Sequence, residues 1–295
     1  MSQIPLQNKD KIDTVHQDQE RAIEVVSDVA YVQLGIVNAV FIGRHGAPDR
    51  EWTLIDTGIW GMGQRLEAAA AERFGENSRP SAIIMTHGHS DHAGNLLYLA
   101  EKWNAPVYAH LSELPYLDGS AAYPPPDPGV GGGVMPILSP LLSRGPVDAR
   151  EWVQPLPLDG SVPSMPGWKW IHTPGHTVGH VSFWREVDRV LIAGDAFITI
   201  NQESVYAVAT QKPEMHGPPS YFTVDWTAAR QSVQDLAELA PLIAITGHGV
   251  PMQGDGMLVA LKILAADFDT IAVPRDGLYV KKPATTTNGL AYVKP

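Results

Sequence analysis

The chain has 295 residues, no cysteine and a formal net charge of −11 at pH 7. Without cysteine it has no disulfide, thiolate zinc site or cysteine nucleophile, so any metal must be held by His, Asp and Glu. The acidic charge argues against a nucleic-acid partner, which would require a basic surface. Residues 1–20 are polar, and no apolar run reaches the roughly eighteen residues of a membrane span. We therefore expect a cytoplasmic protein without a membrane partner.

The N-terminal part of the chain alternates apolar strands with helices. Residues 29–43 have the pattern of two strands. Further strands are predicted over residues 52–56, 81–85 and 106–109, and helices over residues 66–74 and 93–103. This alternation is typical of an α/β layered fold, in which helices cover a sheet.

A similar order recurs in the C-terminal half. Strands are predicted over residues 168–172, 181–185, 189–193 and 242–246, and helices over residues 226–239 and 257–268. Residues 201–219 lack a clear period and are predicted to be irregular. Because each half runs from strands to helices, the pattern is consistent with an internally duplicated sandwich.

A Pro- and Gly-rich insertion at about residues 118–157 separates the two halves. It contains Pro124-Pro125-Pro126 and Gly131-Gly132-Gly133, and its residues 134–142 are apolar. Long irregular segments in compact domains are commonly lids, binding loops or disordered segments. The apolar residues favour a lid or pocket wall over a free linker.

The densest cluster of polar side chains is Thr86-His87-Gly88-His89-Ser90-Asp91-His92. A single histidine is more often a structural residue than a ligand, but three imidazoles and a carboxylate at this spacing indicate a metal site. The cluster follows a predicted strand, where side chains two residues apart share a face. His87 and His89 can therefore reach one ion, while Asp91 and His92, past the strand end, could bind a second.

Other candidate ligands stand at predicted strand ends beside Gly or Thr: Asp56, His176, Asp195 and His248. Side chains at strand ends converge on a shared cleft in layered α/β folds. We expect His172 and His180, which flank His176, to be structural. The histidines without a motif are expected at the surface or in loops: His16, His45, His110 and His216. Of these, His216 could border the cleft, and Trp60, just after Asp56, could face the substrate.

Taken together and in this order, these motifs resemble those of the metallo-β-lactamase-fold hydrolases, among which glyoxalase II enzymes and lactonases are the most similar groups. The resemblance spans residues 29–268 and implies an αββα sandwich, which we expect to form a single domain over residues 1–295. It also implies a two-metal site. His87, His89 and His176 would bind the first ion, and Asp91, His92 and His248 the second. Asp195 would bridge both ions, and Asp56 would hold the ligand loops.

The resemblance implies hydrolysis by a metal-bridging hydroxide that attacks a carbonyl of a small lactone, ester, thioester or lactam. Asp91 would be catalytic, because it could orient the nucleophile or pass a proton to the leaving group. Zinc suits the His and Asp ligands, although iron and manganese bind the same set. A mononuclear iron sulfur dioxygenase, a lactam-specific enzyme and a non-catalytic binding module stay open as alternatives. The partner is expected to be a small molecule, and the oligomeric state is left open, a dimer included.

Two features bear on the substrate without deciding it. Glyoxalase II enzymes usually bind glutathione through a basic C-terminal region, and only Lys281 and Lys282 stand in the corresponding tail. Acyl-homoserine lactonases usually carry a tyrosine shortly after the bridging aspartate, where this chain has Phe197. The insertion at residues 134–142 would suit an apolar acyl group.

Overall fold

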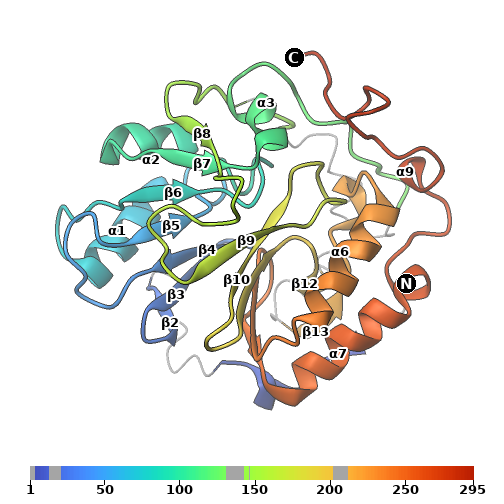
Figure 1. Ribbon diagram of the computed structural model, residues 1–295, viewed down its shortest axis with the longest axis horizontal. Helices are drawn as coiled ribbons and strands as arrows, with labels where there is room; N and C mark the ends of the chain where they lie inside the picture. Colours follow the sequence, from blue (N-terminus) through green and yellow to red (C-terminus); the bar gives the residue numbers. More distant parts are fainter. Residues whose placement is uncertain (1–3, 13–20, 131–142, 146, 202–211) are drawn as a thin grey trace.

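The computed structural model describes residues 4–12, 21–130, 143–145, 147–201 and 212–295 (Figure 1). The largest sheet has seven strands in the order β2-β3-β4-β5-β6-β7-β8. Their bounds are Ile23–Val26, Val29–Leu34, Val37–Ile42, Thr53–Ile55, Ala82–Ile84, Val107–Ala109 and Val153–Pro155. Strands β2 to β5 pair antiparallel, and β5 to β8 pair parallel.

The second sheet has five strands in the order β15-β14-β11-β10-β9. Their bounds are Met252–Gln253, Ile243–Thr246, Val190–Gly194, Val181–Arg185 and Trp168–His172. A third sheet joins β1 (Ile4–Pro5), β13 (Pro213–His216) and β12 (Ile198–Ile200). The two larger sheets meet at one edge, where the Val181 backbone N–H donates to the Thr86 carbonyl at 3.0 Å.

Helices cover the outer faces of the two larger sheets (Figure 1). The long helices are α1 (Gly63–Phe74), α2 (Leu96–Trp103), α6 (Trp226–Glu238) and α7 (Gly254–Ala266). Short helices are α3 (Leu114–Leu117), α8 (Phe268–Ile271) and α9 (Leu278–Lys281), with 3-10 turns at Asn8–Asp10, Leu111–Glu113 and Ser220–Phe222. Among the described residues, no helix combines the length and apolarity needed to cross a membrane.

Successive side chains along a strand point to opposite faces of the sheet, and this alternation produces the layers. In β4, Phe41 packs with α1 and α2 residues such as Leu66 and Leu99, whereas Val40 faces the core shared with the second sheet. Both faces of this strand are buried, so its sequence is a nearly continuous apolar run. On the far side, α6 and α7 pack on the outer face of the second sheet in a separate core. The predicted αββα sandwich is therefore confirmed.

Most predicted elements lie within three residues of the observed ones, but several short strands were missed. Residues 213–216, predicted to be irregular, form β13, which pairs with β1 through Ile4 and Met215. The prediction was wrong there because the pairing joins distant parts of the chain. Strands β2, β8 and β12 were also missed, and β8 lies inside the predicted insertion. Residues 134–142 lie outside the described residues.

Candidate metal centre

The predicted ligands follow the ends of β6, β9, β11 and β14 and gather at the edge where the two larger sheets meet. Their ligand atoms form three groups, each with all its atoms within 4.8 Å of one another. The groups are His87, His89 and His176; His87, His92 and Asp195; and Asp91, His92 and His248. We call the first of these the first triad and the last the second triad. Every member is buried except Asp91, whose side chain is 23% exposed.

Neighbouring side chains fix the tautomers of the first triad. The Thr86 hydroxyl donates to Asp56 at 2.7 Å, so it can only accept from His87 Nδ1, which lies 3.0 Å away. The Thr223 hydroxyl donates to a backbone carbonyl and can likewise accept from Nδ1 of His176 at 3.4 Å. Each ring therefore keeps its proton on Nδ1 and presents an Nε2 lone pair, the form in which imidazole binds a metal.

The third member of the first triad, His89, turns Nδ1 rather than Nε2 toward the other histidines. His89 Nδ1 lies 3.0 Å from His176 Nε2. The rings of Tyr123 and Phe222 pack on His89, with centroids 4.3 and 4.8 Å from its own. His89 is therefore held in place mainly by aromatic contacts.

The second triad is oriented by oxygen acceptors. His92 Nδ1 lies 2.8 Å from Asp56 Oδ2, and His248 Nδ1 lies 2.7 Å from the Ile36 carbonyl oxygen. Both acceptors require a proton on Nδ1, which turns Nε2 toward the carboxylates. His248 Nε2 is 3.4 Å from Asp91 Oδ2.

Asp195 lies between the two triads. Its Oδ2 is 3.4 Å from His176 Nε2 and 3.2 Å from His248 Nε2, while its Oδ1 is 3.6 Å from His92 Nε2. Gly247 leaves room for this carboxylate, because a Cβ there would come within 2.0 Å of Oδ1. One carboxylate thus faces histidines of both triads.

The donor set fits a divalent cation. Among the described residues, the buried side-chain atoms without a hydrogen-bond partner include His87 Nε2, His92 Nε2 and Asp195 Oδ1. These atoms belong to the same group of candidate ligands. Orphaned buried polar atoms are costly, and cations bound beside them would satisfy them. Imidazole nitrogens with carboxylate oxygens suit zinc, iron or manganese.

The two triads differ in their protonation. Burial, together with the neighbouring imidazoles, holds the pKa of His87 and of His176 well below the usual range, and burial lowers the pKa of His89 to about 4. Burial also disfavours protonation of the imidazoles in the second triad, but there the attraction of the neighbouring carboxylates outweighs it. Asp195 and Asp91 raise the pKa of His248 to about 10, and the same carboxylates with Asp56 raise the pKa of His92 well above its usual value.

Several histidines lie outside the ligand groups. His180 Nε2 accepts from the Asp195 backbone N–H at 2.9 Å, and burial lowers its pKa to about 3, so it supports the loop rather than facing the triads. His172 is exposed and stacks on His110, with ring centroids 4.2 Å apart. His45 is exposed, and His16 lies outside the described residues. Trp60 is 82% exposed, so whether it faces a substrate stays a prediction.

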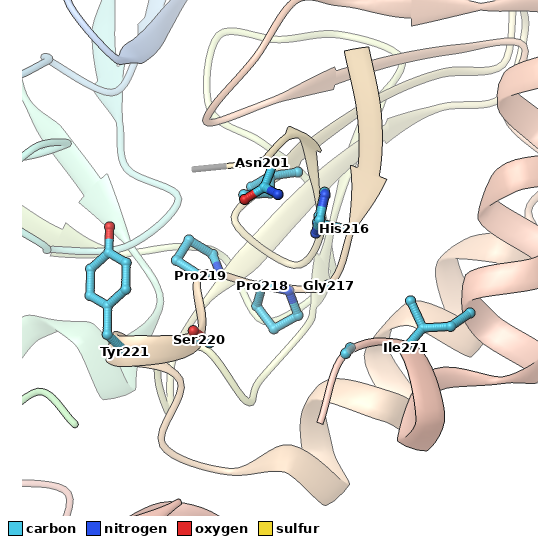
Figure 2. Close-up of a pocket in the computed structure, with 10 residues that line it drawn as sticks. Asn201, His216, Gly217, Pro218, Pro219, Ser220, Tyr221 and Ile271 are labelled. Carbon is cyan, nitrogen blue, oxygen red and sulfur yellow. The ribbon is translucent and has the colours of Figure 1, made fainter. Parts of the chain in front are cut away.

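His216 lines a separate small cavity of about 20 Å³ (Figure 2). Figure 2 shows it beside Asn201, with Pro218 and Pro219 across from them. This volume suits about one water molecule, which is too small for a substrate. None of the described residues that line the cavity belongs to the three ligand groups.

Sequence reasoning missed some residues that hold the centre. Asn38 in β4 donates to the Thr246 and Gly249 carbonyls, at 2.9 and 2.6 Å, and so fixes the turn that carries His248. Glu113 is fully buried and bonds to both loops of the first triad. The only signal for Glu113 was an acidic residue beside the apolar segment that forms α3.

Comparison with known proteins defines the class. The family model of the metallo-beta-lactamase superfamily matches residues 32–248, and the chain belongs to this family. It is a metal-dependent hydrolase with a His/Asp metal-binding cluster.

Particular relatives agree with this class. The chain is 44% identical to the probable metallo-hydrolase YflN of Bacillus subtilis (strain 168), over 84% of this chain and 94% of that protein. A beta-lactamase domain protein from Burkholderia ambifaria has a similar fold, with a TM-score of 0.59 at 17% identity, covering 90% of this chain and 80% of that one. The structure of TTHA1623 in a di-iron-bound form has a TM-score of 0.50 at 23% identity, covering 80% and 95%.

Proposed function

We propose that the chain is a dinuclear metal-dependent hydrolase of a small lactone, ester, thioester or lactam. The observation that carries the proposal is the position of Asp195, whose carboxylate faces histidines of both triads at 3.2–3.6 Å. A single-metal enzyme would not need the second triad, in which Asp91, His92 and His248 present further ligand atoms within 4.8 Å of one another.

In this proposal each triad would hold one ion, and Asp195 would be shared between the two. The first ion takes His87, His89 and His176, and the second takes Asp91, His92 and His248. Asp56 contacts no ion but accepts from His92 and Thr86, which keeps the ligand loop in register. Bound ions would lower the pKa of a shared water toward neutrality and so supply a nucleophile.

Asp91 is the residue that we propose as catalytic. It is the one candidate ligand with an appreciably exposed side chain, at 23%, so it lies at the mouth of the centre. Its exposed carboxylate can exchange a proton with a group that enters from solvent, and its Oδ2 lies 3.4 Å from His248 Nε2. We propose that Asp91 orients the attacking water and passes its proton to the leaving group.

We propose zinc as the bound metal, two ions per chain. The related protein TTHA1623 is known in a di-iron-bound form, so iron is the competing identity here. A small-molecule substrate, a single domain over residues 1–295, a cytoplasmic location and the absence of nucleic-acid and membrane partners are our further predictions for this chain.

The test combines metal analysis with a substrate panel. Protein purified without added metal should contain close to two zinc ions per chain, and it should hydrolyse at least one of the lactone, ester, thioester and lactam substrates. Removing metal with a chelator should abolish the activity, and adding zinc back should restore it. One iron per chain with oxygen consumption on a persulfide would contradict the proposal in favour of the sulfur dioxygenase.

A further inference from the structure

A buried carboxylate joins the two loops that carry the first triad. Glu113 is 0% exposed, and its Oε2 accepts from the Gly88 backbone N–H at 3.0 Å. Its Oε1 accepts from the Thr177 hydroxyl at 2.7 Å and from the Gly179 backbone N–H at 2.9 Å. Gly88 stands between His87 and His89, and Thr177 follows His176, so one side chain reaches both ligand loops.

The neighbours of Glu113 are all hydrogen-bond donors. Among the ion pairs of the described residues, none includes Glu113, so its carboxyl group is satisfied by hydrogen bonds alone. The Tyr123 hydroxyl also donates to Oε2 and accepts from the Gly88 N–H at 2.8 Å. Burying a carboxylate is costly, and burial raises the pKa of Glu113. A side chain placed only for packing would avoid this cost, and the bonds to both loops indicate a more specific role.

We propose that Glu113 is a positioning residue for the first triad: it fixes the backbone between His87 and His89 relative to the loop that carries His176. The role rests on the proposed two-metal function. The hydrogen bonds described for Glu113 go to backbone and hydroxyl groups, so we propose that it acts through the loops and not on the metal itself.

Tyr123 belongs to the same group of hydrogen bonds as Glu113, and Tyr116 provides a matched control. The two rings are stacked with centroids 3.7 Å apart, and both are buried. The Tyr123 hydroxyl bonds to Gly88 and Glu113, whereas the Tyr116 hydroxyl donates to the Ala291 carbonyl in the C-terminal tail at 2.7 Å. Removing the Tyr116 hydroxyl costs one buried hydrogen bond and removing the Tyr123 hydroxyl costs two, but only the loss at Tyr123 reaches the ligand loop.

The expected effect is selective for one triad. In Glu113→Gln an amide NH₂ replaces one oxygen and faces donors, so either the Gly88 side or the Gly179 side loses its acceptor. Tyr123→Phe removes the hydroxyl that braces Gly88. Because changes to groups that orient metal ligands typically lower metal affinity by about 10–100-fold, we expect about a tenfold loss at the first triad. Affinity at the second triad should stay within about twofold.

Cobalt titration of the metal-stripped, full-length protein tests this role. His89→Ala and His248→Ala, each lacking a ligand of one triad, assign the visible absorption bands of the two sites. Glu113→Gln and Tyr123→Phe should show the tenfold loss in the first-triad band alone, and Tyr116→Phe should bind cobalt as the wild type does. Should Glu113→Gln fail to fold, the comparison of Tyr123→Phe with Tyr116→Phe tests the proposed role by itself.

Two results would overturn the role of Glu113. One is wild-type affinity at both sites in Glu113→Gln and Tyr123→Phe; the other is an equal loss in Tyr116→Phe, which would point to the fold of the tyrosine stack. In both cases wild-type protein binding two cobalt ions would leave the proposed function intact. If the wild type takes up no cobalt at either triad, the proposed function fails and this role fails with it.

Discussion

The two triads of the metal centre are held by different kinds of neighbour. In the second triad, Asp56 accepts directly from the His92 ring at 2.8 Å, so a carboxylate orients a candidate ligand itself. In the first triad, the buried carboxylate is Glu113, and it bonds only to backbone and hydroxyl groups on either side of the ligands. The difference distinguishes a carboxylate that bonds to the imidazole from one that bonds to the loops carrying the imidazoles, which is the role we propose for Glu113.

The triads differ in charge as well. Without metal, burial favours neutral imidazoles in the first triad, whereas Asp195 and Asp91 favour protonated ones in the second. A cation that bound at the first triad would therefore find lone pairs already available. A cation that bound at the second triad would have to displace protons, because metal ligands are deprotonated.

Substituting His87 should have the largest effect, because its side chain belongs to the ligand groups of both His176 and Asp195. In His87→Ala we expect loss of metal at the first triad and a fall in kcat of about a thousandfold. This estimate follows from the several kcal/mol that a catalytic metal supplies, at about 1.4 kcal/mol per tenfold. Metal content and steady-state kinetics check it. His172→Ala, an exposed histidine on β9, is the control, and full metal content and activity in His87→Ala would refute the site assignment.

Substituting Asp56 should weaken mainly the second triad. Asp56→Asn keeps the shape but loses an acceptor for the donors of Thr86 and His92. We expect about a 10–100-fold lower affinity for the second ion, measured by competition with a chromophoric chelator. Asp28→Asn, which alters a carboxylate paired with Arg185 on β10, should leave both affinities unchanged. A loss of metal affinity confined to the first triad would contradict the role of Asp56 in orienting the second.

The two triads should also differ, more modestly, in how their metal affinity depends on pH. With a pKa of about 10, His248 carries a proton at neutral pH that the metal must displace. Affinity at the second triad should therefore fall as pH is lowered, by about tenfold per unit for each displaced proton, and the raised pKa of His92 adds a second proton to that of His248. His89, with a pKa of about 4, is already neutral above pH 5, so affinity at the first triad should be nearly flat from pH 6 to 8. Equal slopes at the two sites would contradict this difference.

The sequence allowed prediction of the sandwich and of the residues that gather at its edge. Those residues carry local signals, since each follows an apolar strand and stands beside Gly or Thr, as Asp195 does after Gly194. Glu113 carries no such signal, because its hydrogen-bond partners on the two ligand loops lie 25 to 66 residues away. Strand β13 was missed for a related reason, since it is completed by Ile4 from the other end of the chain.

The central claim is that this edge of the sandwich holds two ions with Asp195 between them, and anomalous scattering from crystals of the zinc-loaded protein tests it most directly. We predict two peaks about 3.5–4 Å apart, one at each triad, with an Asp195 oxygen about 2.0–2.2 Å from each ion. A single peak at His87, His89 and His176, with Asp91, His92 and His248 left to hydrogen-bond among themselves, would contradict it.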